Sequence, residues 1–316
     1  MSVKKAIVTG ASGFIGNAVC AELAARGIEV IAAVRRGSER SAKMESEFGI
    51  RIVESDLSEF GSLDERIPDR DADVLFHFAW TGSAGALRGD GATQLDNVRY
   101  TLDTVKACRK LNCGRFVFAS SVMEYETAAL MKTEAEPGIG TLYGSAKIAA
   151  NYMARATAAH LGVTYLPAVI SNVYGPGEDS PRLLNTALRK LLRGEHCSFS
   201  PGNQLYDFIY ITDAAKAFVA IGEKGRANRT YYIGSLNPKP LKELLLDMRN
   251  QVNPSIRLGI GELPFTGVSL TYQEFDIYAL RDDTGFTPEV RFADGIQKTI
   301  QWLKEAESCR DFSFRN

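Results

Sequence analysis

The stretch "VTGASGFIG", residues 8–16, constrains the fold of this chain more than any other feature. It follows the apolar run "KAIVTG" and leads into the helical pattern "GNAVCAELAARG", so its glycines stand between a strand and a helix. Gly10 permits a tight turn, Gly13 lets the backbone approach a pyrophosphate, and Gly16 lets the helix pack closely on its strand. The free N–H groups of the first helical turn can then bind phosphate. The motif predicts a dinucleotide-binding βαβ unit.

Apolar strands and helices continue to alternate through the first half of the chain. Continuous apolar strands separated by helices are typical of a parallel sheet that is covered on both faces. We therefore expect an α/β fold, a Rossmann-type doubly wound parallel sheet with a smaller C-terminal α/β cap that binds substrate. Further strands are expected at 29–34, 50–56, 72–80, 115–121 and 162–177.

The pattern of strands and helices changes at about residue 175, where shorter elements alternate with loops rich in proline and glycine. The expected dinucleotide-binding domain is 1–172, with 207–222 added to it. Residues 173–316 are expected to form mainly the substrate-binding domain. No clean linker separates the two parts.

The composition limits the classes of partner. Lysine and arginine number 37 against 38 acidic residues, a formal charge of −1, so charge gives no reason to expect nucleic acid or an anionic membrane. No apolar run approaches the roughly 18 residues of a membrane span, and the N-terminus lacks a signal-peptide pattern. Five scattered cysteines indicate reduced thiols, and three separated histidines have no metal-ligand spacing. We expect a cytoplasmic protein without a metal site.

The end of the second expected strand, "VIAAVRRGSER", indicates which dinucleotide binds. A carboxylate there would bind the ribose 2′-OH of NAD, whereas an arginine can bind the 2′-phosphate of NADP. Arg35 and Arg36 occupy this place, and the first acidic residue of this stretch is Glu39. Because arginine pairs strongly with phosphate, we expect NADP(H) to be preferred, with NAD(H) as the alternative. The competing interpretation is that both arginines lie in a solvated turn.

Tyr143 and Lys147 stand four residues apart at the start of the helical pattern "TLYGSAKIAANYMARA". This spacing places both side chains on one face of a helix. The same pair also arises on ordinary helix surfaces, so the spacing alone does not assign a function.

Taken together, the motifs resemble the extended short-chain dehydrogenases/reductases, and within them the nucleotide-sugar epimerases, dehydratases and 4-keto reductases. The similarity covers nearly the whole chain and is carried by "TGASGFIG", "DVLFHFA", "FVFASS", "YGSAK", "NVYGPG", "YDFIYITDAAKAF" and "TGFTPEVRFADGIQKTIQWLK". The resemblance implies that Ser121, Tyr143 and Lys147 are catalytic. Substrate contacts are expected from Trp80, Ser121, Met123, Asn172 and Tyr206. Cofactor contacts are expected from Gly10, Ser12, Gly13, Phe14, Ile15, Gly16, Arg35, Arg36, Asp56, Leu57, Phe78, Ala79, Asn97, Tyr143 and Lys147.

The chemistry of these side chains agrees with the implied roles. A free tyrosine has a pKa of about 10, too high for ready proton exchange at pH 7. An ammonium one helical turn away, such as that of Lys147, and the positive nicotinamide would lower the pKa of Tyr143. Ser121 can donate a hydrogen bond to the same substrate oxygen. Hydride transfer to or from a sugar carbon would then accompany proton transfer by Tyr143.

Departures from the family pattern narrow the function. Val122 and Met123 stand where dehydratases carry an acidic pair, and Met123 also replaces the cysteine of 3,5-epimerising reductases, so neither activity is expected. We interpret the nearby Glu124 and Glu126 as parts of a solvated turn. Trp80 replaces a small residue, and a place in the pocket wall and a place in the core are equally expected.

Tyr206 stands where the family usually has an arginine that neutralises the substrate diphosphate. Arg182 and Arg257 are candidates to compensate, although each is more typical of a surface residue.

The cofactor inference favours an NADPH-dependent reductase of a keto sugar, nucleotide-linked or not. The alternatives are an NAD-dependent nucleotide-sugar 4-epimerase and a non-enzymatic dinucleotide sensor. The long helices expected at 93–112 and 143–161 match the pair through which this family forms a four-helix dimer interface. We therefore expect a homodimer that acts on a small molecule.

Overall fold

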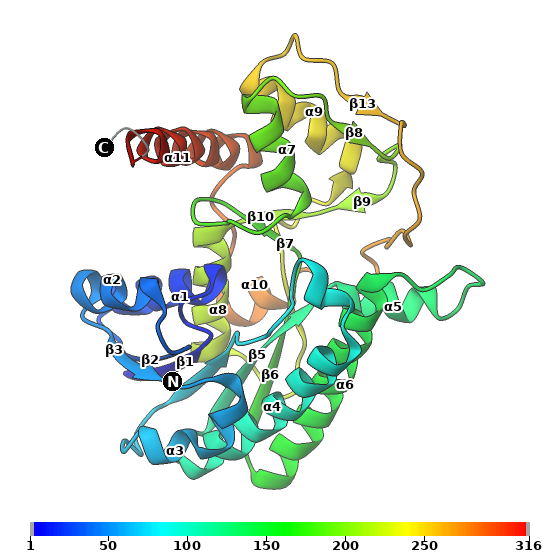
Figure 1. Cartoon of the computed structure of the whole chain (residues 1–316). Helices are drawn as coiled ribbons and strands as arrows, with labels where there is room; N and C mark the ends of the chain where they lie inside the picture. Colours follow the sequence, from blue (N-terminus) through cyan, green and yellow to red (C-terminus); the bar gives the residue numbers. More distant parts are fainter. Residues whose placement is uncertain (1–2, 314–316) are drawn as a thin grey trace.

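A seven-stranded parallel sheet forms the larger part of the computed structural model, which describes residues 3–313 (Figure 1). The strand order is β11-β6-β5-β4-β1-β2-β3, and every neighbouring pair is parallel. The predicted Rossmann-type sheet is thus confirmed. Its strands are β1 (Lys5–Thr9), β2 (Glu29–Val34), β3 (Arg51–Glu54), β4 (Val74–His77), β5 (Arg115–Ser121), β6 (Thr164–Ile170) and β11 (Tyr231–Ile233).

The order of the strands reverses at β1, which lies between β2 and β4. Thr9, the last residue of β1, pairs with Ala33 of β2 and His77 of β4, so the carboxyl ends of the three strands meet. In open parallel sheets, ligands bind in the crevice outside such a switch point. The glycine motif begins at Gly10, immediately after this end.

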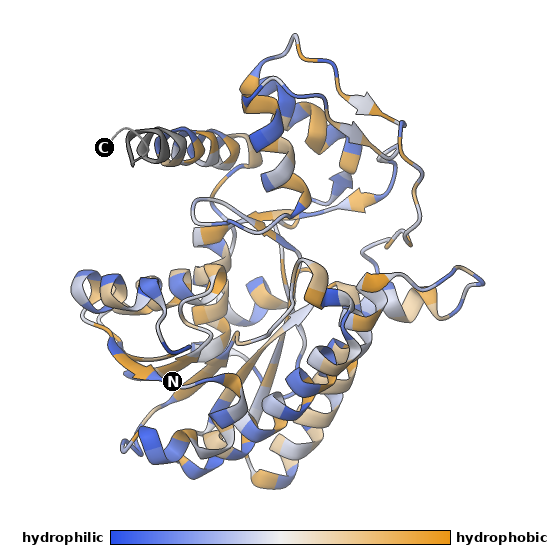
Figure 2. Ribbon diagram, in the orientation of Figure 1, coloured by the Kyte–Doolittle hydropathy of each residue, from blue (hydrophilic) through white to orange (hydrophobic). Residues whose placement is uncertain are grey.

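Helices cover both faces of the sheet. Successive strand side chains point to opposite faces, and those on both faces are apolar and need to be buried. Val8 packs into the core cluster beneath one helical layer, and its neighbour Ile7 packs into the cluster beneath the other. Figure 2 shows the apolar strands enclosed between the layers. The first layer contains α1 (Phe14–Ala25), α2 (Glu39–Phe48), α8 (Ile211–Lys224) and α10 (Ala279–Thr284). The second contains the 3₁₀ helix η1 (Leu57–Ser62), α3 (Leu63–Arg66), α4 (Gly91–Lys110) and α6 (Ile139–Leu161).

The C-terminal part stands above the carboxyl ends of the strands and is built from three helices and three short strand pairs (Figure 1). The chain enters it after β6 and returns to the sheet through α8 and β11 before crossing again. Its helices are α7 (Leu183–Leu192), α9 (Leu241–Val252) and α11 (Phe292–Ser313). The strand pairs are β7 (Asn172–Tyr174) with β10 (Phe208–Tyr210), β9 (Leu205–Tyr206) with β12 (Lys239–Pro240), and β8 (Ser198–Phe199) with β13 (Gly259–Ile260).

Two short helices frame the crevice between the two parts. The 3₁₀ helix η2 (Ala86–Gly89) lies in the connection between β4 and α4, and α5 (Met123–Leu130) follows β5. The sequence predicted no helix at α5. Within the described residues, no helix is both long and apolar enough to cross a bilayer, and none of their side chains form a group of three or more that could hold a metal ion.

Candidate active site

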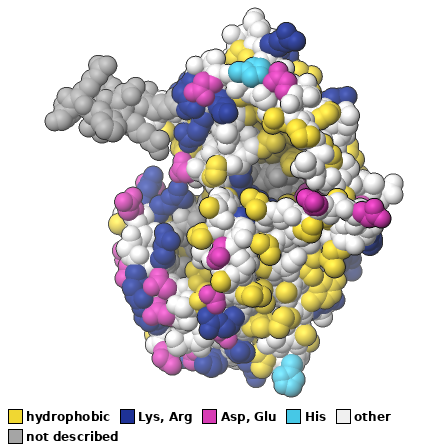
Figure 3. Space-filling model, turned by 45° about the vertical axis from the view of Figure 1, so that its right-hand side comes forward, with side chains coloured by type: hydrophobic (Ala, Val, Ile, Leu, Met, Phe, Trp, Pro, Cys, Tyr) yellow, Lys and Arg dark blue, Asp and Glu magenta, His cyan; other side chains and the backbone are white. Residues whose placement is uncertain are grey.

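A cavity of about 300 Å³ opens between the carboxyl end of the sheet and the C-terminal part. Figure 3 shows this hollow from outside, between the two parts of the molecule. Five residues predicted from the sequence line it: Ser121, Met123, Tyr143, Asn172 and Tyr206. One site is therefore formed by the end of β5, the start of α5, the N-terminal part of α6, and the strands β7 and β9.

Ser121 and Tyr143 face this cavity, while Lys147 lies buried behind them. Tyr143 and Lys147 are only 8% and 5% exposed. The Lys147 ammonium donates a hydrogen bond to the Ala119 carbonyl at 2.9 Å, and the Ser121 hydroxyl accepts one from the backbone N–H of Met123 at 3.2 Å. The helix α6 and the end of β5 thus hold the three predicted catalytic side chains next to one another.

Burial has the largest effect on the pKa values of Tyr143 and Lys147. Burial raises the pKa of Tyr143, against the opposing effects of the cations Arg182 and Arg88 and of the Ser121 hydroxyl. Burial lowers the pKa of Lys147 to about 7, and the carboxylate of Glu124 partly opposes this shift. We expected Lys147 to supply the field that favours the phenolate, but in this structure the two arginines are the cations that supply it.

The glycine loop fits a bound dinucleotide. Gly10 has φ +68°, and a Cβ on it would lie 2.5 Å from the backbone nitrogen of Ala79. A Cβ on Gly16 would lie 2.3 Å from the Gly10 carbonyl oxygen, and the Gly13 N–H donates to the same oxygen at 3.0 Å. Only glycine allows the turn, the start of α1 and the end of β4 to approach so closely, and this leaves backbone at the place where a pyrophosphate binds.

The residues around the loop are held by packing and by one arginine. Phe14 and Ile15 pack against the core from the first turn of α1. Arg40 donates from one guanidinium nitrogen to the Ser12 carbonyl at 3.2 Å and from the other to Asp179 at 3.1 Å. It thereby ties the glycine loop to the loop after β7, a contact that the sequence analysis missed.

The two arginines after β2 differ in their surroundings. Arg36 forms ion pairs with Asp56 at 2.8 Å and with Glu59 at 2.6 Å, next to Leu57 at the start of η1. Arg35 is exposed, and no ion pair or hydrogen bond joins its side chain to another of residues 3–313. Arg35 is therefore the side chain with a free guanidinium at the place predicted for the adenosine ribose.

Asn97 and Trp80 position the backbone and side chains behind the site. The Asn97 amide accepts from the N–H of Thr81 at 2.9 Å and donates to the carbonyl of Thr81 at 2.8 Å. Trp80 donates from its indole to Gln94 at 3.0 Å and does not line the cavity. Of the two places expected for Trp80, the pocket wall and the core, the structure shows the core, where its ring packs against Tyr143 and Lys147. Phe78 and Ala79 pass directly over Gly10.

The interpretation of Glu124 and Glu126 as parts of a solvated turn is wrong. Both lie on α5, whose first turn folds against α6 instead of into solvent. Glu124 is buried and accepts hydrogen bonds from Ser120 and, at 2.8 Å, from Asn151. Glu126 lines the cavity, and burial raises its pKa to about 7.

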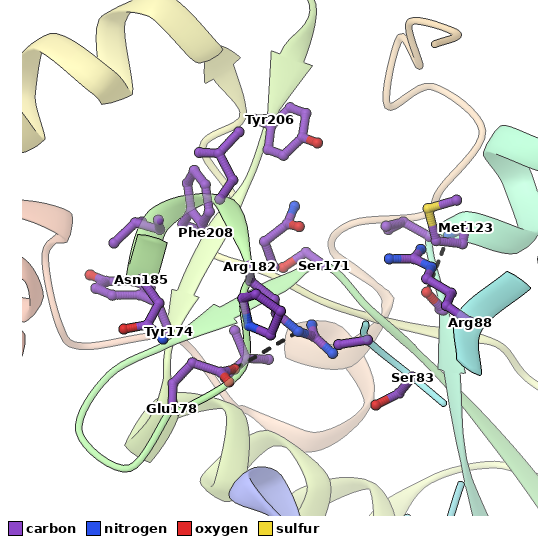
Figure 4. A pocket seen from close by; sticks show the side chains of 18 of the residues that line it. Ser83, Arg88, Met123, Ser171, Tyr174, Glu178, Arg182, Asn185, Tyr206 and Phe208 are labelled. Carbon is purple, nitrogen blue, oxygen red and sulfur yellow. Dashed lines mark hydrogen bonds and ion pairs between the residues drawn. The ribbon is translucent and has the colours of Figure 1, made fainter. Parts of the chain in front are cut away.

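Two arginines bring positive charge to the cavity, and the sequence indicated only one of them. Arg182, a candidate, lines the cavity with its Nε 3.9 Å from Glu178, as the dashed line in Figure 4 marks. Arg88 lies on the opposite side, next to Met123, and the sequence analysis missed it. Arg257, the other candidate, is exposed and does not line the cavity.

A family model that describes the NAD dependent epimerase/dehydratase family matches residues 6–234. The chain belongs to this family. The predicted resemblance to the extended short-chain dehydrogenases/reductases is thereby confirmed. The family is one of enzymes that use a nicotinamide dinucleotide, which leaves the sensor alternative without support.

Similar proteins extend the match over almost the whole chain. The dTDP-glucose 4,6-dehydratase of Xanthomonas campestris pv. campestris is 26% identical, over 94% of this chain and 92% of that protein. A putative UDP-glucose 4-epimerase of Methanocaldococcus jannaschii is also 26% identical, over 94% and 98%. The Bordetella bronchiseptica enzyme WbmF, solved in complex with NAD⁺ and UDP, superposes with a TM-score of 0.79 at 19% identity, over 99% of this chain and 96% of that one.

Proposed function

We propose that this family member transfers a hydride between a nicotinamide dinucleotide and a carbon of a nucleotide-linked sugar, with Tyr143 as the proton donor and acceptor. The observation that carries the proposal is the shared cavity of Ser121 and Tyr143, with Lys147 buried one helical turn further along α6. A bound dinucleotide would supply or accept the hydride.

Each catalytic side chain has a distinct role in this proposal. In reduction, the Tyr143 hydroxyl gives its proton to the substrate carbonyl oxygen, and in oxidation the phenolate takes a hydroxyl proton. Ser121 donates a hydrogen bond to the same oxygen and stabilises the charge that develops on it. Lys147 would hold the nicotinamide ribose and, when protonated, add to the field that favours the phenolate.

The proposed cofactor is NADP(H), on the strength of Arg35. The strand β2 ends at Val34 without a carboxylate that could bind a ribose 2′-OH, and the guanidinium of Arg35 is exposed and unpaired among residues 3–313. Arg35→Ala should raise the Kd of NADP(H) about tenfold or more, because charge-assisted contacts to phosphate are worth about 1.5–3 kcal/mol. NAD(H), which lacks the 2′-phosphate, is the matched ligand and should bind both proteins alike.

The proposed substrate is a nucleotide sugar. Arg182, Asn172 and Tyr206 line the side of the cavity formed by the C-terminal part and supply one cation and two uncharged hydrogen-bonding groups for a diphosphate. The names of the relatives, which act on dTDP-glucose or UDP-glucose, support this substrate class. We retain 1–172 with 207–222 as the proposed dinucleotide-binding domain and 173–316 as mainly the substrate-binding domain.

Reduction of a keto sugar is the proposed reaction, and 4-epimerisation is the second candidate. NAD⁺ bound to WbmF and to a UDP-glucose 4-epimerase of Bifidobacterium longum favours the second. An epimerase returns the hydride to the same substrate and keeps its dinucleotide, whereas a reductase consumes NADPH.

One measurement separates the two reactions. The purified protein is denatured and its released dinucleotide quantified, and NADPH oxidation is then followed with 4-keto sugars linked to UDP or dTDP. The proposal predicts a substoichiometric dinucleotide content and NADPH oxidation with at least one keto sugar. Stoichiometric bound NAD together with no NADPH oxidation would make the reductase proposal wrong.

A further inference from the structure

Arg88 lies in the wall of the active-site cavity without an anionic partner. It belongs to η2, and its guanidinium carbon lies 4.7 Å from the centre of the Tyr143 ring. The side chain is half-buried, and its Nε is buried with no hydrogen-bond partner. No hydrogen bond or ion pair joins the Arg88 side chain to any other residue in the range 3–313.

Arg182 provides the comparison within the same cavity. Its Nε lies 3.9 Å from the carboxylate of Glu178, so this cation has a counter-charge in the free protein. The positive charge of Arg88 acts on the carboxyl group of Glu126 and opposes the rise of its pKa, but the two side chains form no ion pair within the described chain. Burial also keeps Glu126 partly protonated near neutral pH, which weakens it as a counter-ion.

An arginine in this state is poised for an anionic ligand. Leaving a half-buried guanidinium unpaired costs free energy, and an incoming carboxylate that pairs with it in two parallel hydrogen bonds recovers that cost. Such bonds are about 2.8 Å long, so the anion would lie close to the guanidinium and hence to the Tyr143 ring. In the proposed reaction Tyr143 exchanges its proton with the oxygen on the reacting carbon, so an anion beside its ring would belong to the same sugar ring.

We propose that the sugar of the substrate carries a carboxylate on the ring carbon next to the reacting one, and that Arg88 binds this carboxylate. The inference rests on the proposed function, since it specifies the substrate class of that site. Arg88 is then the residue that determines specificity for an acidic sugar, and Arg182 is left to face the diphosphate. The two cations of the cavity thus serve two anionic groups of one substrate.

Binding to the dinucleotide-loaded enzyme tests this assignment. The Kd values of UDP-glucuronic acid, UDP-glucose, UDP and dTDP are measured by calorimetry on the wild type, on Arg88→Gln and on Arg257→Gln. In the ratio of the Kd values of the two sugar nucleotides, the contribution of the shared UDP group cancels. The wild type should prefer UDP-glucuronic acid over UDP-glucose by about tenfold or more, which corresponds to at least about 1.4 kcal/mol.

The variants assign the preference to one residue. Arg88→Gln should abolish the preference by weakening the acidic sugar selectively, and Arg257→Gln, which removes an exposed arginine outside the cavity, should keep it. Arg88→Lys keeps the charge but not the planar fork and should restore the preference only in part.

Three other outcomes overturn the inference. Equal binding of the two sugar nucleotides by the wild type would show that the cavity has no carboxylate site. If Arg88→Gln lost affinity equally for both sugar nucleotides and for UDP, Arg88 would be assigned to the diphosphate. Both results leave the proposed function standing, whereas a wild type that binds neither sugar nucleotide, UDP nor dTDP would also end the nucleotide-sugar proposal.

Discussion

The ammonium nitrogen of Lys147 lies 3.7 Å from the centre of the Trp80 indole ring. The same ring meets Tyr143 edge to face, with ring centres 5.9 Å apart. The negative face of an indole stabilises a cation, so Trp80 supports the charged form of a lysine whose pKa burial lowers to about 7. Trp80 therefore contacts both the proposed proton donor and the lysine that we propose assists it.

Replacing Trp80 should make Lys147 lose its proton at lower pH. A desolvated cation–π contact is worth about 1–2 kcal/mol, so Trp80→Leu should move the alkaline limb of the kcat profile down by about one pH unit. Trp80→Phe retains an aromatic face and should move it less. The measurement is kcat against pH for the three proteins; coincident alkaline limbs would show that Trp80 does not support the charge of Lys147.

The glycine loop allows a comparison at matched backbone conformation. Gly10 and Gly27 have φ values of +68° and +71°, but only Gly10 has backbone atoms within 4 Å of the position of an added Cβ. Gly27→Ala should therefore cost about 1 kcal/mol of unfolding free energy, and Gly10→Ala at least about 2 kcal/mol more.

Urea denaturation measures both unfolding free energies, and titration with dinucleotide measures the Kd of each folded variant. Gly10→Ala should also bind dinucleotide at least about tenfold more weakly, since displacing Ala79 deforms the loop. Equal effects of the two substitutions would contradict the close packing of Gly10 against the end of β4.

Local patterns were sufficient to predict the sheet and the helix face that carries Tyr143 and Lys147. The glycine spacing and the apolar strands depend on neighbouring residues along the chain, and so does the placement of Tyr143 and Lys147 on one helical turn. Asn97 was expected among the cofactor contacts, and the structure shows its side chain bonded to the backbone of Thr81 beside the site.

The charges of the cavity could not be predicted in the same way. Arg88 lies in a connection without periodic apolar residues, and its place beside Tyr143 depends on how that connection folds over α6. Glu124 and Glu126 were expected in solvent because the short helix α5 has no clear start signal or apolar stripe in the sequence. Both carboxyl groups are enclosed only by tertiary packing, which local patterns do not describe.

Glu126 should make the protein less stable as the pH rises. Burial raises the pKa of Glu126 from 4.5 to about 7, so between these values the folded protein binds more protons than the unfolded chain. The free energy of unfolding should then fall with rising pH across that window, by at most about 1.4 kcal/mol per pH unit. Relative to the wild type, Glu126→Gln should gain stability between pH 4.5 and pH 8.

The control is Glu45→Gln, which changes an exposed glutamate on α2. Urea unfolding at several pH values gives the difference between each variant and the wild type. A pH-independent difference for Glu126→Gln would place this carboxyl group in contact with solvent.

A homodimer should form through α4 and α6. These helices carry exposed apolar side chains, among them Leu95, which is 71% exposed, and Tyr152, which is 67% exposed. Figure 3 shows hydrophobic side chains gathered on the lower right of the molecule. Exposed apolar surface on this scale is typical of an interface.

Sedimentation equilibrium tests the dimer. Leu95→Glu combined with Tyr152→Glu should convert a dimer to a monomer, because two buried carboxylates would oppose association. Leu246→Glu places one carboxylate on an exposed apolar position of α9 and should leave the assembly unchanged. A wild-type monomer, or a dimer that survives the double substitution, would contradict this interface.

The most direct test of the account is Tyr143→Phe, which removes the proposed proton donor and keeps the buried ring. Dinucleotide Kd and kcat are measured for this variant and for Tyr278→Phe, which changes an exposed tyrosine on the surface. Tyr143→Phe should bind dinucleotide within about threefold of the wild type while its kcat falls by about 10²–10⁴-fold, and Tyr278→Phe should resemble the wild type in both. Turnover by Tyr143→Phe within about threefold of the wild type would contradict the proposed role of Tyr143 as proton donor.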